Sequence, residues 1–155
     1  MKLLTAGDRA YGDIPCFMAA DREGAGRMPQ WKRLSPEVDD LAPDGSSVRL
    51  LCATGRGSMA HFELPPGAVS RPVRHRTVEE IWYVVAGTGA MWQNLDDENY
   101  EILLEQGLSL TIPVGAAFQF RNSGTTVLEI VAVTMPPWPG PSEAQPAEGR
   151  WPSTM

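Results

Sequence analysis

The sequence is poor in the two side chains that most often bind transition metals. Its 155 residues include only two Cys and two His. Cys16 and Cys52 are far apart and lack the short spacing of a zinc site, so we expect two reduced, mostly buried thiols rather than a disulfide. With His61 and His75 as its whole supply of imidazole, the chain cannot build a metal site that needs three histidines.

The chain also lacks an excess of basic residues and any long apolar run. Lys and Arg number 13 against 19 Asp and Glu, a formal net charge of -6, which disfavours nucleic acid as the main partner. No apolar run approaches the length needed to cross a bilayer, and the first residues do not form a secretory signal. We therefore expect a cytoplasmic protein with neither a nucleic-acid nor a membrane partner.

Long amphipathic helical patterns and internal repeats are missing as well. The composition, 43% hydrophobic and 21% charged, is that of one globular domain. The 15 Gly and 14 Pro are scattered between short apolar runs, which predicts many short strands separated by turns. Strands at this spacing indicate an antiparallel sandwich or barrel.

The chain divides into three regions. Residues 1–45 form an N-terminal arm with a strand expected at 14–19 and a short helical turn beginning at 35–37, where a Ser precedes a Pro. Residues 46–134 form the barrel. Its clearest expected strands are 48–53, 58–64, 81–85, 90–95, 100–104, 108–112, 117–121 and 126–134.

The third region, residues 135–155, is a Pro-rich tail. Pro cannot donate a hydrogen bond to a central ladder, so we expect this segment to be extended rather than part of the barrel. Trp138 and Trp151 each offer a large apolar area that is costly to leave in water. The tail is therefore expected to lie across the barrel or across a neighbouring subunit.

Two stretches carry Gly, Pro, His and acidic residues at fixed spacings. They are residues 67–87, GAVSRPVRHRTVEEIWYVVAG, and residues 107–122, GLSLTIPVGAAFQFRN. They resemble the two motifs of the cupin superfamily, G-x5-H-x-H-x(3,4)-E-x6-G and G-x5-P-x-G-x2-H-x3-N. The positions that fit these motifs are Gly67, His75, Glu80, Gly87, Gly107, Pro113, Gly115 and Asn122.

The resemblance implies an all-β fold with little helix, the double-stranded β-helix or jelly-roll barrel of cupins. It also implies a degenerate metal site, because Val73 and Phe118 stand at two of the four usual ligand positions. We therefore expect no cofactor, with a divalent metal as the weaker alternative.

Positions that hold the metal in cupins point into the barrel, and side chains in a strand alternate between its two faces. The resemblance therefore implies a mostly apolar pocket with one imidazole and one carboxylate, a usual character for a small-molecule site. The expected lining residues are Val73, His75, Glu80, Trp82, Phe118 and Phe120.

His75 and Glu80 are the candidate catalytic residues. Two inward groups that would share an ion in the family could instead share a proton. An apolar wall raises the pKa of a carboxyl group, and a nearby imidazolium lowers it. The pair suits general acid–base chemistry such as enolisation, dehydration or ring closure. The alternative is an ion pair that only fills the barrel.

A metal-dependent alternative needs a third ligand. If the strand before the first motif turned His61 inward, then His61, His75 and Glu80 would form a set of two histidines and one carboxylate. We favour the other orientation, in which His61 and Glu63 lie on the outer face as a solvated pair.

Arg71 has the strand parity of Val73 and His75 and is a candidate for the mouth of the pocket. A guanidinium there would select a carboxylate or phosphate group on the ligand. Arg74 and Arg76 have the outward parity and are expected to pair on the surface.

Three functions remain open at this point. The first is a metal-independent isomerase, cyclase or lyase that uses His75 and Glu80. Its substrate would be a small, largely apolar molecule, either neutral or anionic. The second is a non-catalytic protein that holds such a ligand. The third is a metal-dependent oxygenase that uses His61, His75 and Glu80. In each case cupins suggest a homodimer that pairs sheets and exchanges terminal strands.

Overall fold

Two antiparallel sheets make up the structure, a computed structural model that describes residues 29–155. The first sheet has the strand order β1-β2-β3-β10-β5-β8. Its strands are β1 (Asp40–Leu41), β2 (Ser47–Ala53), β3 (Ser58–Leu64), β10 (Leu128–Met135), β5 (Glu79–Ala86) and β8 (Ser109–Ile112).

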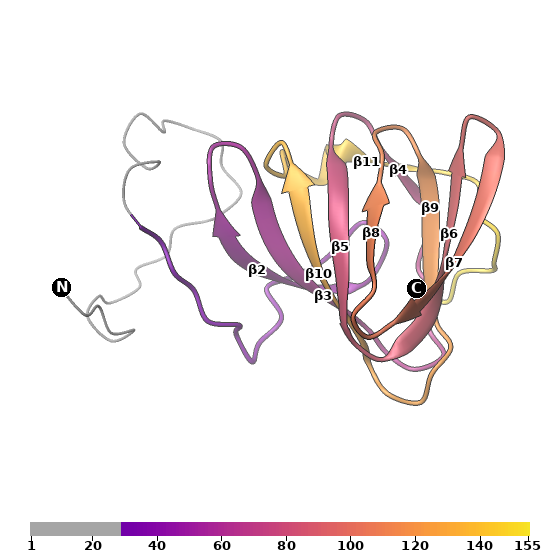
Figure 1. The fold of residues 1–155 in the computed structure, drawn as a ribbon, viewed down its shortest axis with the longest axis horizontal. Coiled ribbons are helices and arrows are strands. Elements are labelled where there is room, and N and C mark those ends of the chain that lie inside the picture. The colour runs from indigo at the N-terminus through magenta and orange to yellow at the C-terminus, as the bar shows by residue number, and fades with distance from the viewer. Residues whose placement is uncertain (1–28) are drawn as a thin grey trace.

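The second sheet has the order β11-β4-β9-β6-β7 and faces the first across the core (Figure 1). Its strands are β11 (Ala144–Pro146), β4 (Val73–His75), β9 (Ala117–Asn122), β6 (Thr88–Leu95) and β7 (Glu98–Glu105). The chain passes repeatedly from one sheet to the other, and within residues 29–155 the helical content is one 3-10 turn, Pro141–Glu143. The predicted all-β jelly roll with little helix is confirmed.

Burial follows the period of two that the sequence predicts for half-buried strands. Residues of β10 alternate strictly between buried and partly buried, and those of β5 alternate between exposed and buried from Glu79 to Val84. The inward rings pack edge to face, with Trp82 and Phe120 centred 5.0 Å apart. Within the described residues, no helix is long and apolar enough to span a membrane.

The motif glycines sit where the chain turns back sharply. Gly87 connects β5 to β6 with a φ of 83°, and a Cβ there would lie 2.5 Å from the carbonyl oxygen of Val127. Both the left-handed backbone and the close approach exclude a side chain. This turn brings β6 into the second sheet directly after β5 has crossed the first.

The N-terminal arm differs from the sequence prediction. Residues 36–37 form a bend, where the Glu37 amide donates to Ser35 Oγ at 3.1 Å, and no helical turn follows. The chain is extended there instead, since the Asp39 amide donates to the Val48 carbonyl and leads into β1 beside β2. The strand expected at 14–19 lies outside the described residues.

The C-terminal region is more ordered than the predicted extended tail. Residues of β11 pair with β4 and add an edge strand to the second sheet, a position that tolerates Pro146. Beyond β11 the chain is held by Gln119, whose amide nitrogen donates to the carbonyls of Ser70 and Trp151. Gln119 Oε1 accepts from the amides of Arg150 and Trp151. The tail thus lies on its own barrel.

Gln119→Leu should release this segment. Gln119 is fully buried, and its loss would leave backbone groups of Arg150, Trp151 and Ser70 without partners at a cost of about 2–4 kcal/mol. Thermal unfolding and limited proteolysis near the C-terminus measure the change. The matched control is Gln145→Leu on the exposed side of β11. Equal stability of the two variants would contradict the role assigned to Gln119.

Candidate functional site

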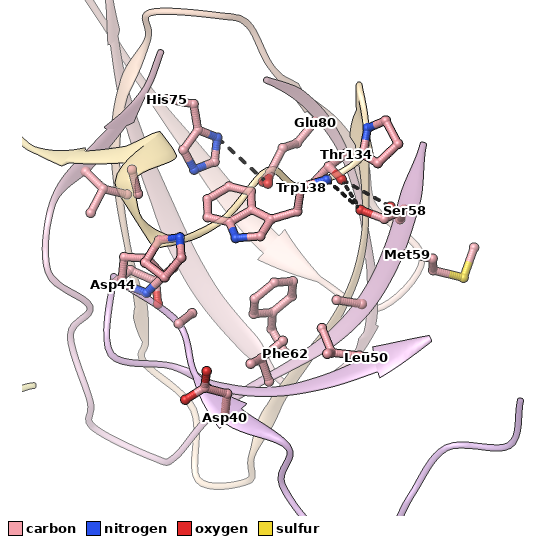
Figure 2. Close-up of a pocket in the computed structure, with 18 of the residues that line it drawn as sticks. Asp40, Asp44, Leu50, Ser58, Met59, Phe62, His75, Glu80, Thr134 and Trp138 are labelled. Atoms are coloured by element: carbon pink, nitrogen blue, oxygen red, sulfur yellow. Dashed lines mark hydrogen bonds and ion pairs between the residues drawn. The ribbon is translucent and has the colours of Figure 1, made fainter. Parts of the chain in front are cut away.

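A cavity of about 260 Å³ opens at one end of the barrel, between the two sheets. Five residues expected at the pocket line it, Val73, His75, Glu80, Trp82 and Phe118. Figure 2 shows His75 and Glu80 at the same side of this cavity, with Phe62 across from them and Trp138 over it. The prediction that these five side chains on β4, β5 and β9 point into the barrel therefore agrees with the structure.

His75 and Glu80 come from different sheets and meet at the cavity wall. His75 ends β4 in the second sheet, and Glu80 is the second residue of β5 in the first. His75 Nδ1 lies 3.8 Å from Glu80 Oε1, too far for a direct hydrogen bond. Within the described residues, this buried nitrogen has no hydrogen-bond partner.

Burial keeps both groups neutral over a wide pH range. Desolvation lowers the pKa of His75 to about 4, although the negative charge of Glu143 acts in the opposite direction. Desolvation raises the pKa of Glu80 to about 7, against the hydrogen bond that Trp82 Nε1 donates to Glu80 Oε2 at 2.6 Å. Between these values the pair consists of a free imidazole and a protonated carboxyl group, not an ion pair.

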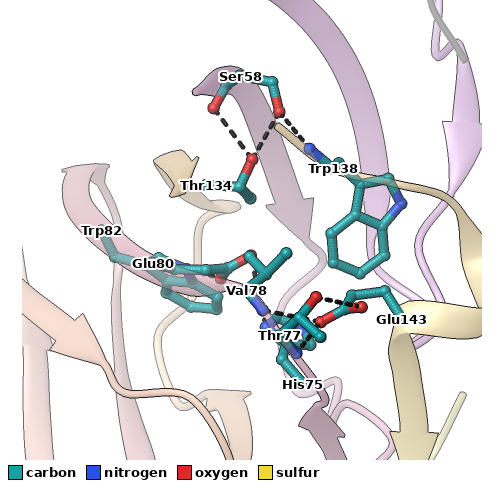
Figure 3. Close-up of polar contacts among 9 residues, drawn as sticks. All are labelled: Ser58, His75, Thr77, Val78, Glu80, Trp82, Thr134, Trp138 and Glu143. Atoms are coloured by element: carbon teal, nitrogen blue, oxygen red, sulfur yellow. Dashed lines mark hydrogen bonds and ion pairs between the residues drawn. The ribbon is translucent and has the colours of Figure 1, made fainter. Parts of the chain in front are cut away.

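The connection between β4 and β5 is fixed by Glu143, a buried residue of the 3-10 turn in the C-terminal region. Glu143 Oε1 accepts from the amides of Thr77 at 2.5 Å and Val78 at 2.8 Å, and Oε2 accepts from the Thr77 hydroxyl at 3.0 Å (Figure 3). Burial would raise the pKa of this carboxyl group, but these hydrogen bonds outweigh it and the pKa is lowered. Glu143 therefore stays ionised and holds His75 and Glu80 at their positions.

Trp138 closes one side of the cavity. Its ring meets the His75 ring edge to face at 5.2 Å. Its backbone amide donates to Ser58 Oγ at 3.0 Å, and Ser58 Oγ lies 2.5 Å from Thr134 Oγ1 (Figure 3). The indole is thus positioned both by its ring contact and by a hydroxyl pair at the start of β3 and the end of β10.

Two residues expected at the pocket lie elsewhere. Arg71 precedes β4, in chain without regular strand structure, so the alternation of β4 does not extend to it. Its side chain is exposed and donates to the backbone oxygens of Met155 and Pro43. Phe120 faces inward but is completely buried in the core behind Trp82 and does not line the cavity.

His61 lies on the outer face of the first sheet, as favoured, but it is not solvated. Its neighbours Ala60 and Phe62 line the cavity, so His61 points the other way. It is 3% exposed, with Nε2 3.1 Å from Glu129 Oε2 and Nδ1 4.0 Å from Glu63 Oε1. The set of His61, His75 and Glu80 is therefore not brought together.

The residues at the cavity do not fit the metal that the fold suggests. Val73 and Phe118 offer no ligand atoms, so the four motif positions supply one imidazole and one carboxyl group, whose Oε2 already accepts from Trp82. Elsewhere in residues 29–155, atoms of His61, Glu63 and Glu129 lie within 4.8 Å of one another. There the Arg49 guanidinium already pairs with Glu63 Oε1 at 2.7 Å.

Sequence reasoning missed Asp44, Ser58, Thr134 and Glu143. Asp44, Ser58 and Thr134 line the cavity, and Glu143 supports it from behind. Asp44 sits in a Pro-Asp-Gly turn, an ordinary surface signal, and Glu143 lies in a Pro-rich stretch. Trp138, which also lines the cavity, was the one residue outside the motifs that the sequence could place, because a large apolar side chain is costly to expose and was expected to pack against the barrel.

The comparisons with known proteins agree with the motifs. A family model described as Cupin domain matches residues 60–134. The uncharacterised protein MJ1618 of Methanocaldococcus jannaschii is 30% identical over 120 residues, which cover 72% of this chain and 93% of that protein. The alginate biosynthesis protein AlgA of Pseudomonas fluorescens is 35% identical over 79 residues, which cover 51% of this chain but 16% of AlgA.

Solved structures extend the likeness to the fold. The capsular polysaccharide assembling protein CapF of Staphylococcus aureus superposes with a TM-score of 0.62 at 24% identity, covering 76% of this chain and 35% of CapF. An oxalate decarboxylase gives a TM-score of 0.56 at 16% identity, covering 60% of this chain and 26% of the decarboxylase. The chain thus spans about a third or less of each of these larger proteins, and the likeness concerns the fold alone.

The raised pKa of Glu80 predicts how stability depends on pH. Because the folded value of about 7 lies above the ordinary 4.5, the contribution of Glu80 is fully present below pH 4.5 and is lost as pH rises through 7. Glu80→Gln removes this loss, so it should raise the free energy of unfolding by about 3 kcal/mol at pH 8 and by less than about 1 kcal/mol at pH 5. Denaturant unfolding at both pH values measures this.

The control for this experiment is Glu79→Gln, which changes the neighbouring, exposed carboxylate. It should leave the pH dependence as in the wild type. Parallel pH profiles of wild type and Glu80→Gln would show that Glu80 titrates normally and would contradict the argument from burial.

Proposed function

The chain belongs to the cupin superfamily, and we propose that it binds a small, largely apolar molecule in its barrel and exchanges protons with it through His75 and Glu80. The reaction class is isomerase, cyclase or lyase, and no metal or other cofactor takes part. The observation that supports this most is the 3.8 Å approach of His75 Nδ1 to Glu80 Oε1 in the wall of an apolar cavity. Burial there favours a free imidazole and a protonated carboxyl group.

The two groups have complementary tasks. His75 Nδ1 is buried, lacks a hydrogen bond within the described residues and is a base above about pH 4. Glu80 is an acid below about pH 7. His75 takes a proton from a carbon next to a carbonyl group, and Glu80 gives its proton to the carbonyl oxygen. When a carbon–carbon double bond adjoins that carbon, the conjugated enol takes the proton back from His75 at the far end of the double bond while Glu80 recovers the proton of the hydroxyl group. This shift of the double bond is an isomerisation with no net change in protons.

The surroundings of the pair favour such a step. Trp82 Nε1 holds Glu80 Oε2, so Oε1 is the oxygen that faces His75. Val73, Phe118 and Trp138 keep the wall apolar, which keeps water from competing for the proton. The carboxyl group and the imidazole also need no rearrangement of their own, because the turn between them is clamped by Glu143.

Proton exchange with small ketones tests the proposal without knowledge of the natural substrate. Uptake of deuterium from D₂O into cyclohexanone and phenylacetone, followed by NMR, should be accelerated by the wild type. His75→Gln and Glu80→Gln should each lower this rate about 100-fold, since each removes one member of an acid–base pair. The wild-type rate should be highest between about pH 4 and 7, where His75 is free and Glu80 is protonated.

The second candidate is a non-catalytic protein that holds a ligand in the same cavity. It predicts that ligands raise the melting temperature while deuterium uptake stays at the rate of the buffer. A rate that is equal in wild type, Glu80→Gln and the control Glu79→Gln would favour this candidate. A rate that disappears with a chelator and returns with metal would instead contradict both.

We also propose that the protein is a homodimer that pairs the outer faces of its first sheets. Ile81 and Tyr83 lie two residues apart on the outer face of β5 and are 43% and 49% exposed, so pairing of these faces would bury both apolar side chains. Sedimentation should give twice the mass of the chain, and the double variant Ile81→Lys and Tyr83→Lys should give the single mass. A wild type that sediments as one chain would contradict the pairing.

A further inference from the structure

We propose that the pocket takes an organic cation, a small and largely apolar molecule that carries one protonated amine anchored by the Asp44 carboxylate. This inference rests on the proposed binding function and specifies its ligand class. It replaces the anionic ligand that the position of Arg71 in the sequence suggested.

The charges around the cavity have one sign. Among the described residues that line it, the side chains able to carry a charge are Asp40, Asp44, Glu80 and His75, and none is Lys or Arg. His75 is neutral above about pH 4, so it supplies no positive charge near neutral pH. A carboxylate or phosphate ligand would therefore enter a site with three acidic groups and no cation.

Asp44 is built into the wall rather than placed on the surface. It is 6% exposed, and its Oδ1 accepts from the Ser46 amide at 2.8 Å and the Ser46 hydroxyl at 2.6 Å. Within residues 29–155, these are its side-chain hydrogen bonds, so Oδ2 remains for a ligand. Figure 2 shows Asp44 on the cavity wall, apart from His75 and Glu80.

Arg71, the cation that acts on Asp44 among the described residues, is directed elsewhere. Arg71 donates through Nε to the Met155 backbone oxygen and through Nη1 to the Pro43 carbonyl. It forms no ion pair with Asp44 among the described residues, and its charge is the smallest of the effects on the pKa of Asp44. Desolvation dominates and raises that pKa, as it does for Glu80, whose pKa the charge of Asp44 raises further.

Aromatic rings supply the rest of a cation site. Ring contacts run without a break from Phe62 to Trp82 at 6.3 Å, Trp82 to Phe118 at 5.9 Å, Phe118 to His75 at 5.1 Å and His75 to Trp138 at 5.2 Å. All five residues line the cavity. The faces of such rings attract ammonium groups, and their apolar bodies suit the remainder of the ligand.

An ammonium group therefore resolves the electrostatic cost that this cavity carries. Asp44 is buried here without an ion pair among the described residues, and an ammonium bound beside it would favour its ionised form. Glu80 lies apart from Asp44, and its burial still favours the protonated form that proton exchange requires. Asp44 holds the amine in this arrangement, which leaves His75 and Glu80 to exchange protons with another part of the same molecule.

Three probes of one shape test the preference for positive charge. Benzylamine, benzyl alcohol and benzoate differ mainly in a charge of plus one, zero and minus one. In titration calorimetry at pH 7, benzylamine should bind at least tenfold more tightly than benzyl alcohol, and benzoate should bind most weakly. Benzoate binding as tightly as benzylamine would overturn the inference while leaving the proposed function intact.

Asp44→Asn tests the anchor. Asn keeps an oxygen that can accept from Ser46, so the turn is preserved, but the charge is lost. The affinity for benzylamine should fall about tenfold, as for the loss of a charged hydrogen bond, while that for benzyl alcohol should stay the same. Asp39→Asn, an exposed acid nearby in the chain, is the matched control and should change neither. An unchanged affinity of Asp44→Asn for benzylamine would assign the anchor elsewhere and overturn the proposal.

The wild type alone provides a second measurement. Binding of benzylamine at pH 6 should release protons, because the ammonium lowers the pKa of Asp44, which burial raises in the free protein; calorimetry in two buffers of different ionisation enthalpy counts them. Benzyl alcohol should release none, and equal counts for the two probes would contradict the proposal. If none of the probes binds but the ketones still exchange deuterium, this inference fails alone. If both assays are negative, the proposed function fails with it.

Discussion

The three hydrogen bonds that Glu143 accepts are the constraint on which the site depends. They fasten the connection between β4 and β5, the point where the chain crosses from one sheet to the other. His75 on one side of this connection and Glu80 on the other are separated by four residues, but they belong to different sheets. A loose turn would let the sheets slide and would change the 3.8 Å separation of the two groups. The relative position of His75 and Glu80 is thus secured by a carboxylate outside the barrel strands.

The strand-borne part of the site was predictable from the sequence because side-chain alternation is a local property. Once the motif spacing set the register, the inward positions of Val73, His75, Glu80, Trp82 and Phe118 followed. The same reasoning failed for Arg71 because β4 begins at Val73. The alternation of side chains between two faces holds only within the strand and does not extend back to Arg71. Within a strand, alternation predicts which face a side chain lies on but not whether it reaches the cavity or the closed core. It therefore could not show that Phe120 lies in the core.

The remaining part was not predictable, because it comes from segments without periodicity. Asp44 reaches the cavity from a turn, and Trp138 and Glu143 reach it from the Pro-rich region beyond the barrel. Their positions depend on long-range contacts such as that of Trp138 with Ser58, 80 residues away in the sequence. His61 shows the same limit. The sequence left both orientations of His61 open and favoured the outward one, while its contact with Glu129 arises from the pairing of β3 with β10.

The apolar residues at two motif positions change what the carboxyl group of Glu80 can do. Val73 and Phe118 add no ligand atoms and exclude water, so the ionised form of Glu80 is costly and its pKa rises to about 7. The proton then becomes the partner of this carboxyl group, which is what acid–base chemistry near neutral pH requires. The same cost applies to Asp44, whose pKa burial also raises. Burial in this cavity disfavours the ionised forms of its own carboxyl groups, so the cavity favours a ligand with a positive charge. The free energy of binding such a ligand then includes the stabilisation of a buried carboxylate.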